Sequence, residues 1–171
     1  MEKNKIIVFC ENTQEAYQIP TGSSLKEFKK IVFPDNHQNI LGALVNNEVR
    51  DLHYEIYNPK YVNFVDVTTL DGYSVYTRSL LFVLYKAVIN LFGKKTLIVE
   101  YQLSNGVFCR LANKDVILTG ERIDTIKAEM QRIIDHDYEI TRTEYPTEEA
   151  IKLFKRQGLK DKELLLSSRG K

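Results

Sequence analysis

The sequence predicts an α+β protein in two parts, because the order of strand and helix patterns changes near residue 68. Before that point, short apolar segments of strand character surround one helix; after it, a long helix precedes a hairpin and two more helices. Of the 171 residues, 43% are hydrophobic and 27% are charged, which is typical of domains that bury a core. We therefore expect one domain at 1–68 and a second at 69–171.

The first part begins with two strands and a capped helix. Strands are predicted at 5–10 and 15–20, because polar turn residues separate two short apolar runs. Ser24 and Glu27 have the spacing of a capping box, in which each side chain accepts a hydrogen bond from the other's backbone N–H. This helix is expected to stop before Pro34, which cannot continue it.

A hairpin and a further strand complete the first part. Residues 42–51 read as two strands joined at Asn46 and Asn47, because asparagine tolerates the positive φ that a tight hairpin turn requires. The next residues are short and irregular, and 61–69 alternates apolar and polar residues as a strand does. With the hairpin counted as one unit, the order is therefore β-β-α-β-β.

The most apolar run of the chain, residues 77–93, is predicted to be a helix of a folded domain. Arg78, Lys86 and Asn90 interrupt it, whereas a bilayer needs about 20 apolar residues. Its apolar residues recur at helical spacing and predict a broad buried face; they include Leu80, Leu84, Val88 and Leu91. We therefore expect a core helix and no membrane span.

The limits of this helix are predicted from its capping residues. Asp71 is a candidate N-cap, and Gly93 is suited to end the helix in the left-handed conformation. A hairpin around Asp71 and Gly72 is the alternative. The helix is favoured, because the apolar periodicity continues through Tyr73 and Tyr76.

The second part continues with a hairpin and an amphipathic helix. Residues 96–112 contain two strand patterns around Asn105 and Gly106, a pair that strongly favours a tight hairpin turn. Thr119 is expected to cap the next helix. One face of that helix is lined by Ile123, Ile126, Met130, Ile133 and Ile134.

Another strand and helix are predicted after this. Residues 137–145 have the composition of a strand, and Pro146 and Thr147 are suited to open a helix that Gly158 ends. The chain stops soon after the apolar run in "KELLL". We interpret this as an element cut short, which indicates a fragment of a longer polypeptide.

No residue pattern indicates a catalytic or metal site. Cys10 and Cys109 are the only cysteines, and we expect both to be reduced thiols in the cytoplasm. The "GKKT" at 93–96 lacks the earlier glycine of a phosphate-binding loop. None of the histidines is at metal-ligand spacing from another histidine or a cysteine: His37, His53 and His136. We therefore expect no catalytic residue, metal or cofactor in this chain.

Charge excludes strong general attraction to nucleic acid or anionic lipid, because Lys and Arg (24) balance Asp and Glu (23). The exception is the segment 151–171, where seven basic residues outnumber two acidic ones. These are Lys152, Lys155, Arg156, Lys160, Lys162, Arg169 and Lys171. They are suited to contact phosphates, although a solvated helix face explains them more simply.

Two resemblances together cover nearly the whole chain. The run "ALVNNEVRDLHYEI…VNFVDVTT", with Asn46, Asn47, Asp51 and Leu52, resembles the TGS domain, a ubiquitin-like β-grasp module. The long helix, the "SNGVF" hairpin, the amphipathic helix and "FKRQGLKDKELLL" are similar to the second domain of threonyl-tRNA synthetases, which edits mischarged tRNA. The resemblance implies a TGS domain followed by an editing-domain-like α+β module.

At the site residues, the sequence departs from the synthetases. The resemblance places two editing histidines at Arg78 and Phe82, a hairpin tyrosine at Cys109 and a pocket lysine at Lys162. Because neither Arg78 nor Phe82 can do a histidine's acid–base or ligand work, we expect a degenerate pocket without zinc or editing. We also expect Phe82 to be buried between the long helix and the hairpin.

The segment 71–93, with Arg-Ser-Leu at 78–80, is more similar to a version of this domain pair in bacterial nucleoside (uridine) kinases. This resemblance implies a non-catalytic regulatory or ligand-binding module, with the P-loop kinase domain downstream as its partner in cis. ATP and magnesium would then serve only that domain. The alternatives are a degenerate synthetase-type editing or RNA-binding module with a nucleotide or RNA ligand, and an interaction adaptor that uses a sheet edge.

Overall fold

The computed structural model describes residues 4–35, 39–93, 97–103, 106–112, 117–141 and 143–169. It confirms the mixed α+β class. The chain divides into two compact units, Met1–Phe82 and Val83–Lys171, and the division falls inside one long helix. The expected domain boundary near residue 68 stays a prediction.

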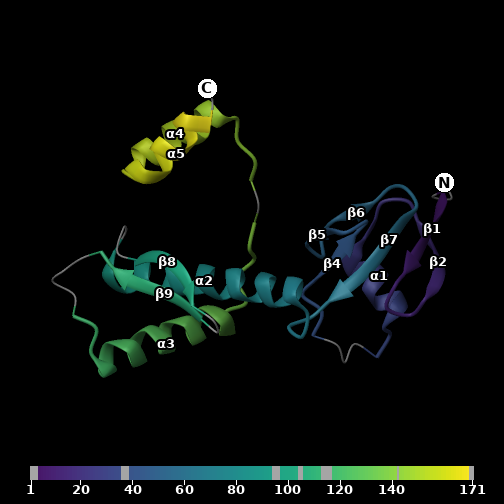
Figure 1. Ribbon diagram of the computed structural model, residues 1–171, viewed down its shortest axis with the longest axis horizontal. Coiled ribbons are helices and arrows are strands. Elements are labelled where there is room, and N and C mark those ends of the chain that lie inside the picture. Colours follow the sequence, from purple (N-terminus) through teal and green to yellow (C-terminus); the bar gives the residue numbers. More distant parts are fainter. Residues whose placement is uncertain are drawn as a thin grey trace. The chain divides into compact units, whose positions relative to one another are not determined.

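The first unit contains a five-stranded sheet with one helix, α1, against it (Figure 1). The strand order is β2-β1-β7-β4-β5, so the first and last long strands are neighbours at the centre, where they run parallel. A separate two-stranded pair joins β3 and β6. The elements are β1 (Lys5–Cys10), β2 (Glu15–Pro20), β3 (Ser23–Ser24), α1 (Leu25–Val32), β4 (Gly42–Val45), β5 (Glu48–Arg50), β6 (Glu55–Ile56) and β7 (Lys60–Val65).

The core of this unit lies between the sheet and α1. Alternate strand residues point inward, and α1 meets them with three apolar side chains; the core includes Val8, Cys10, Ile19, Leu25, Phe28, Val32, Val62 and Phe64. The predicted capping box is confirmed, because the side chains of Ser24 and Glu27 each accept a hydrogen bond from the other's backbone N–H. The predicted hairpin is also confirmed, with positive φ at Asn46 and Asn47.

A side chain in the first turn fixes the position of the last strand. The Asn12 side-chain amide donates to the Phe64 carbonyl at 3.0 Å, and its oxygen accepts from the Phe64 N–H at 2.7 Å. The two residues are 52 positions apart in the sequence. Asn12 therefore takes the place of a neighbouring strand at the point where β1 ends, and it holds β7 beside β1.

Helix α2 (Leu70–Phe92) begins earlier than the predicted cap allows. The expectation that Asp71 is the N-cap is wrong: Asp71 lies inside the first turn, and the Thr69 hydroxyl accepts from the Gly72 N–H at 3.1 Å. Thr69 performs the same chemistry as the expected aspartate, two residues earlier. The helix ends as predicted at Gly93, whose φ is +84°.

Most of α2 is not a core helix, contrary to the prediction. Ala87 and Val88 are buried, whereas Phe82 is 58% exposed and Leu80 is exposed as well. The expectation that Phe82 is buried against the hairpin is therefore wrong. The helical period was correct, but a period does not show how much of an apolar stripe other elements cover. By length and composition alone, α2 is long and apolar enough to cross a membrane; the expectation that it does not cross one stays a prediction.

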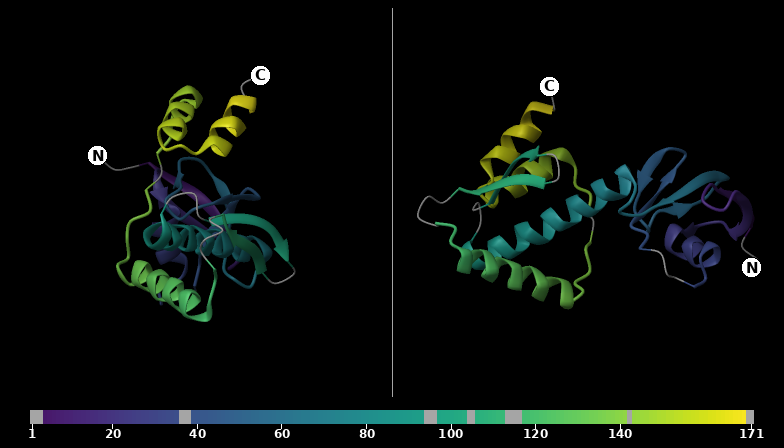
Figure 2. Two further views of the ribbon diagram at one scale, coloured as in Figure 1. Left: turned by 90° about the vertical axis from the view of Figure 1, so that its left-hand side faces the viewer. Right: turned by 60° about the horizontal axis from the view of Figure 1, so that its bottom comes forward.

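The second unit joins the C-terminal part of α2 to a hairpin and three helices (Figures 1 and 2). The hairpin is antiparallel, with a register irregularity between Val99 and Tyr101. The strand predicted at 137–145 is wrong, since its described residues, 137–141 and 143–145, form no strand. The elements are β8 (Leu97–Leu103), β9 (Gly106–Leu111), α3 (Gly120–Asp135), α4 (Thr147–Arg156) and α5 (Lys160–Arg169).

Two phenylalanines provide a matched test of where the core lies. Phe28 is fully buried and contacts the rings of Tyr17 and Phe64, whereas Phe82 is mostly exposed. We expect Phe28→Ala to lower the free energy of unfolding by about 3–5 kcal/mol. Phe82→Ala should lower it by less than about 1 kcal/mol. Urea denaturation measures both changes, and similar decreases in the two variants would contradict this assignment.

Candidate functional site

The four residues that were expected to share a pocket lie on three elements, α2, β9 and α5. Arg78 and Phe82 lie four residues apart on one face of α2, and both are exposed. Cys109 lies on β9, half-buried, and Lys162 lies on α5. Of the four, only Cys109 lines the cavity of the second unit. Their binding roles therefore stay predictions.

The cavity lies between the hairpin, α3 and the C-terminal part of α2, and its volume is about 240 Å³. Its lining is almost wholly apolar and includes Leu84, Val88, Leu111, Leu118, Ile126 and Met130. Two basic residues, Arg110 and Lys127, also line it. Each has a carboxylate partner: Arg110 pairs with Glu100, and the ammonium of Lys127 lies 3.3 Å from Asp124.

The chemistry available in this cavity is limited. Burial raises the pKa of the Cys109 thiol, so the thiolate that a nucleophile requires is disfavoured at neutral pH. Among the described residues, no group of three or more His, Cys, Asp or Glu side chains is placed to hold a metal ion. The cavity is therefore suited to apolar contact rather than to acid–base, nucleophilic or metal chemistry.

Lys162 contacts two aromatic rings of the second unit. Its ammonium lies 5.5 Å from the centre of the Tyr85 ring and 5.6 Å from that of Phe154. Tyr85 belongs to α2 and Phe154 to α4, so one cation connects α5 to both helices through cation–π contacts. Lys162 was singled out in the sequence, whereas its two partners were not, because nothing in the spacing of Tyr85 and Phe154 indicates that one lysine contacts both.

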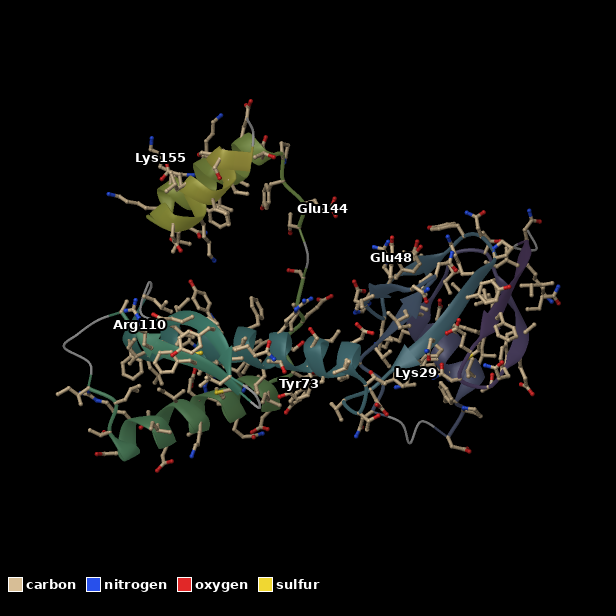
Figure 3. The ribbon with its side chains drawn as sticks, viewed as in Figure 1. Lys29, Glu48, Tyr73, Arg110, Glu144 and Lys155 are labelled. Carbon is tan, nitrogen blue, oxygen red and sulfur yellow. The ribbon has the colours of Figure 1, made fainter. Side chains whose placement is uncertain are left out.

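The turn between α4 and α5 concentrates positive charge. We call Lys152, Lys155, Arg156 and Lys160 the basic turn; all four are exposed. Gly158, with φ of +67°, allows the chain to reverse between the two helices. Figure 3 shows the labelled Lys155 projecting away from the helix pair. These side chains are therefore open to an anionic partner.

A polar network joins α2 to α3. The Asn90 amide donates to one oxygen of Glu129 at 2.7 Å, and Arg132 donates to both Glu129 oxygens at 2.7 and 2.8 Å. The hydrogen bonds from Arg132 and Asn90 lower the pKa of Glu129 to about 2. The spacing of Glu129 and Arg132 on a helix indicates their pairing, but the contact with Asn90 depends on tertiary structure.

The network makes the stability of the second unit depend on pH. Because the folded-state pKa of Glu129 lies below its ordinary value of 4.5, its contribution is fully present above about pH 4.5 and is lost as pH falls toward about 2. We expect Glu129→Gln to increase amide exchange in α3 at neutral pH, and this difference from the unsubstituted chain should shrink below about pH 4.5.

Hydrogen exchange followed by mass spectrometry measures this effect in α3 separately from the first unit. Asp124→Asn on the same helix is the matched control. Asp124 pairs with Lys127 within α3, and both side chains are exposed, whereas Glu129 also contacts Asn90 of α2. Such a surface pair contributes little, so the control should exchange as the unsubstituted chain does. An effect of Glu129→Gln that is constant with pH would contradict the assignment.

Comparison with known proteins finds threonine–tRNA ligases among the relatives of this chain. No family model matches the chain. The threonine–tRNA ligase of Sulfurihydrogenibium sp. (strain YO3AOP1) is 25% identical over 87% of the chain. That of Clostridioides difficile (strain 630) is 28% identical over 79% of the chain. The ligase of Thermotoga maritima is 32% identical over 70%. The chain spans only 23%, 21% and 19% of these relatives, respectively. Over most of its length, it is therefore threonyl-tRNA synthetase-like.

Proposed function

We propose that this chain is a threonyl-tRNA synthetase-type module that binds RNA and has no editing chemistry of its own. The observation that carries the proposal is the match to threonine–tRNA ligases over 70–87% of the chain. The absence of editing is supported by Arg78 and Phe82, which stand where the resemblance places the paired histidines of the synthetases.

The arrangement of the first unit supports a TGS-type β-grasp domain. Its parallel central pair, its strand order β2-β1-β7-β4-β5 and its single helix α1 against one sheet face agree with a ubiquitin-like β-grasp. The Asn46–Asn47 turn lies where the TGS resemblance requires it. We therefore propose that this β-grasp domain and the editing-domain-like module form one RNA-binding chain.

The basic turn provides the contact with RNA in this proposal. Phosphate contacts supply most of the sequence-independent affinity for nucleic acid, and exposed lysine and arginine side chains make them. The basic turn holds four such side chains between the middle of α4 and the start of α5, although the net charge of the whole chain is only +1. An attraction to RNA is therefore local and directs the α4–α5 end of the second unit toward the phosphates.

The prediction concerns threonine tRNA and the salt dependence of its binding. We expect the chain to bind this tRNA with an affinity that falls as salt rises. Replacing Lys152, Lys155 and Arg156 with glutamine should reduce the slope of log affinity against log salt by about one for each phosphate that the variant no longer neutralises. Fluorescence anisotropy at several salt concentrations measures the slope. Mischarged tRNA should be bound as well, and a separate deacylation assay should show that the chain does not hydrolyse it.

The matched control removes three positive charges from the first unit: Lys26, Lys29 and Lys30 of α1. Because the change in net charge is the same, this control should retain the slope if contact at the basic turn is specific. Equal decreases of the slope in both variants would indicate only general charge attraction. Binding that is undetectable at low salt would contradict the proposed function.

A module linked to a nucleoside kinase is the second candidate. The observation that favours it is the Arg78-Ser79-Leu80 sequence in place of the histidine motif. The relatives described above are tRNA ligases, so they support the RNA-binding hypothesis better than the kinase hypothesis. It requires a P-loop domain downstream in the full gene product, with ATP and magnesium bound there. Uridine-dependent consumption of ATP by that product would favour it, and a synthetase core downstream would exclude it.

A further inference from the structure

The face of the five-stranded sheet opposite the core in the first unit holds two aromatic rings. Val65, at the end of β7, alternates to this face but is buried. Strand alternation and pairing place the following side chains opposite the core, and each is at least partly exposed: Lys5, Ile7, Phe9, Gln18, Leu44, Val49, Tyr61 and Asn63. We call this the open face. Tyr61 is 61% exposed and Ile7 is 59% exposed. These are large apolar side chains in water at the centre of a sheet, which is unusual without a partner.

The two rings lie side by side on the two central strands. Phe9 of β1 is paired in register with Tyr61 of β7, and their ring centres are 5.5 Å apart at 60°. In RNA-binding sheets, aromatic side chains on the strands stack against two or three unpaired bases. Stacking is tolerant of sequence, because every base has a π face.

The polar residues of the open face also suit RNA. Gln18 and Asn63 carry amides that can both donate to and accept from base edges, and Lys5 at the start of β1 carries a positive charge. None of the described strand residues on this face carries a carboxylate, which would repel a phosphate backbone. The glutamates at the strand ends, Glu15 and Glu48, alternate to the other side.

The size of the face argues against a second copy of the chain as its partner. Five strands about 4.8 Å apart and about 20 Å long give at most about 500 Å². Two such faces would bury about 1,000 Å², below the roughly 1,200–2,000 Å² of typical stable interfaces. The same area accommodates two or three stacked nucleotides.

We propose that the open face binds unpaired RNA nucleotides by stacking bases on Phe9 and Tyr61. This inference rests on the proposed RNA-binding function and adds a second contact to it, one that recognises single-stranded character rather than charge. The basic turn would hold phosphates, while the open face would select unpaired bases.

The experiment measures the affinity of the full chain for a labelled single-stranded oligoribonucleotide and for a blunt duplex of the same sequence. We expect the single strand to bind more tightly. Phe9→Leu and Tyr61→Leu retain apolar bulk but remove the ring, and each should weaken binding of the single strand about tenfold. Tyr57→Leu is the control, because Tyr57 is also exposed but follows β6, outside the five-stranded sheet. It should leave affinity unchanged.

Several outcomes would overturn the proposal. The first is equal affinity for the single strand and the duplex, and the second is unchanged affinity in both ring variants. The third is that the chain binds no single strand and forms a dimer that Tyr61→Leu dissociates. Circular dichroism checks that the variants fold; Tyr61→Leu is the safer of the two, because Tyr61 is largely outside the core. If tRNA still binds through the basic turn while the single strand does not, the proposed function stands and only this inference fails.

Discussion

The register between β1 and β7 is the constraint on which the first unit depends. Strand side chains alternate between faces, so a slip of one residue in β7 would move its core residues to solvent and Tyr61 into the core. The Asn12 side chain opposes such a slip, because it bonds both backbone groups of Phe64. One turn residue thereby fixes the core and also the pairing of Phe9 with Tyr61 on the open face.

The two units differ in how many of their apolar side chains are buried. The first has a continuous core between α1 and one face of the sheet, and Ile7 and Tyr61 on the opposite face are exposed. In the second, few of the described apolar residues are buried, and no residue of α4 is. Individual polar contacts connect its helices: Glu129 joins α2 to α3, and Lys162 joins α5 to α2 and α4. Its candidate binding groups are accordingly surface charges rather than a buried catalytic set.

The sequence predicted local features such as helix caps and turns. It did not predict which apolar side chains are buried by elements distant in the sequence. The capping box at Ser24 and the turn at Asn46 and Asn47 depend on nearest neighbours, and both were predicted correctly. Thr69 caps α2 instead of Asp71, because both residues carry suitable oxygens and only the backbone geometry selects one. The exposure of Phe82 and the contact of Lys162 with Tyr85 depend on elements distant in sequence, which periodicity does not describe. The candidate site was therefore the least predictable part.

The central claim is that this chain binds RNA through defined surfaces of its two units. Ultraviolet cross-linking of the chain to threonine tRNA, followed by mass spectrometry of the peptides, tests it most directly, because a zero-length link forms only where base and side chain touch. We expect adducts in the peptides that contain Phe9 and Tyr61, and protection of the basic turn from lysine modification in the complex. Adducts confined to α1, or no adduct at saturating tRNA, would contradict it.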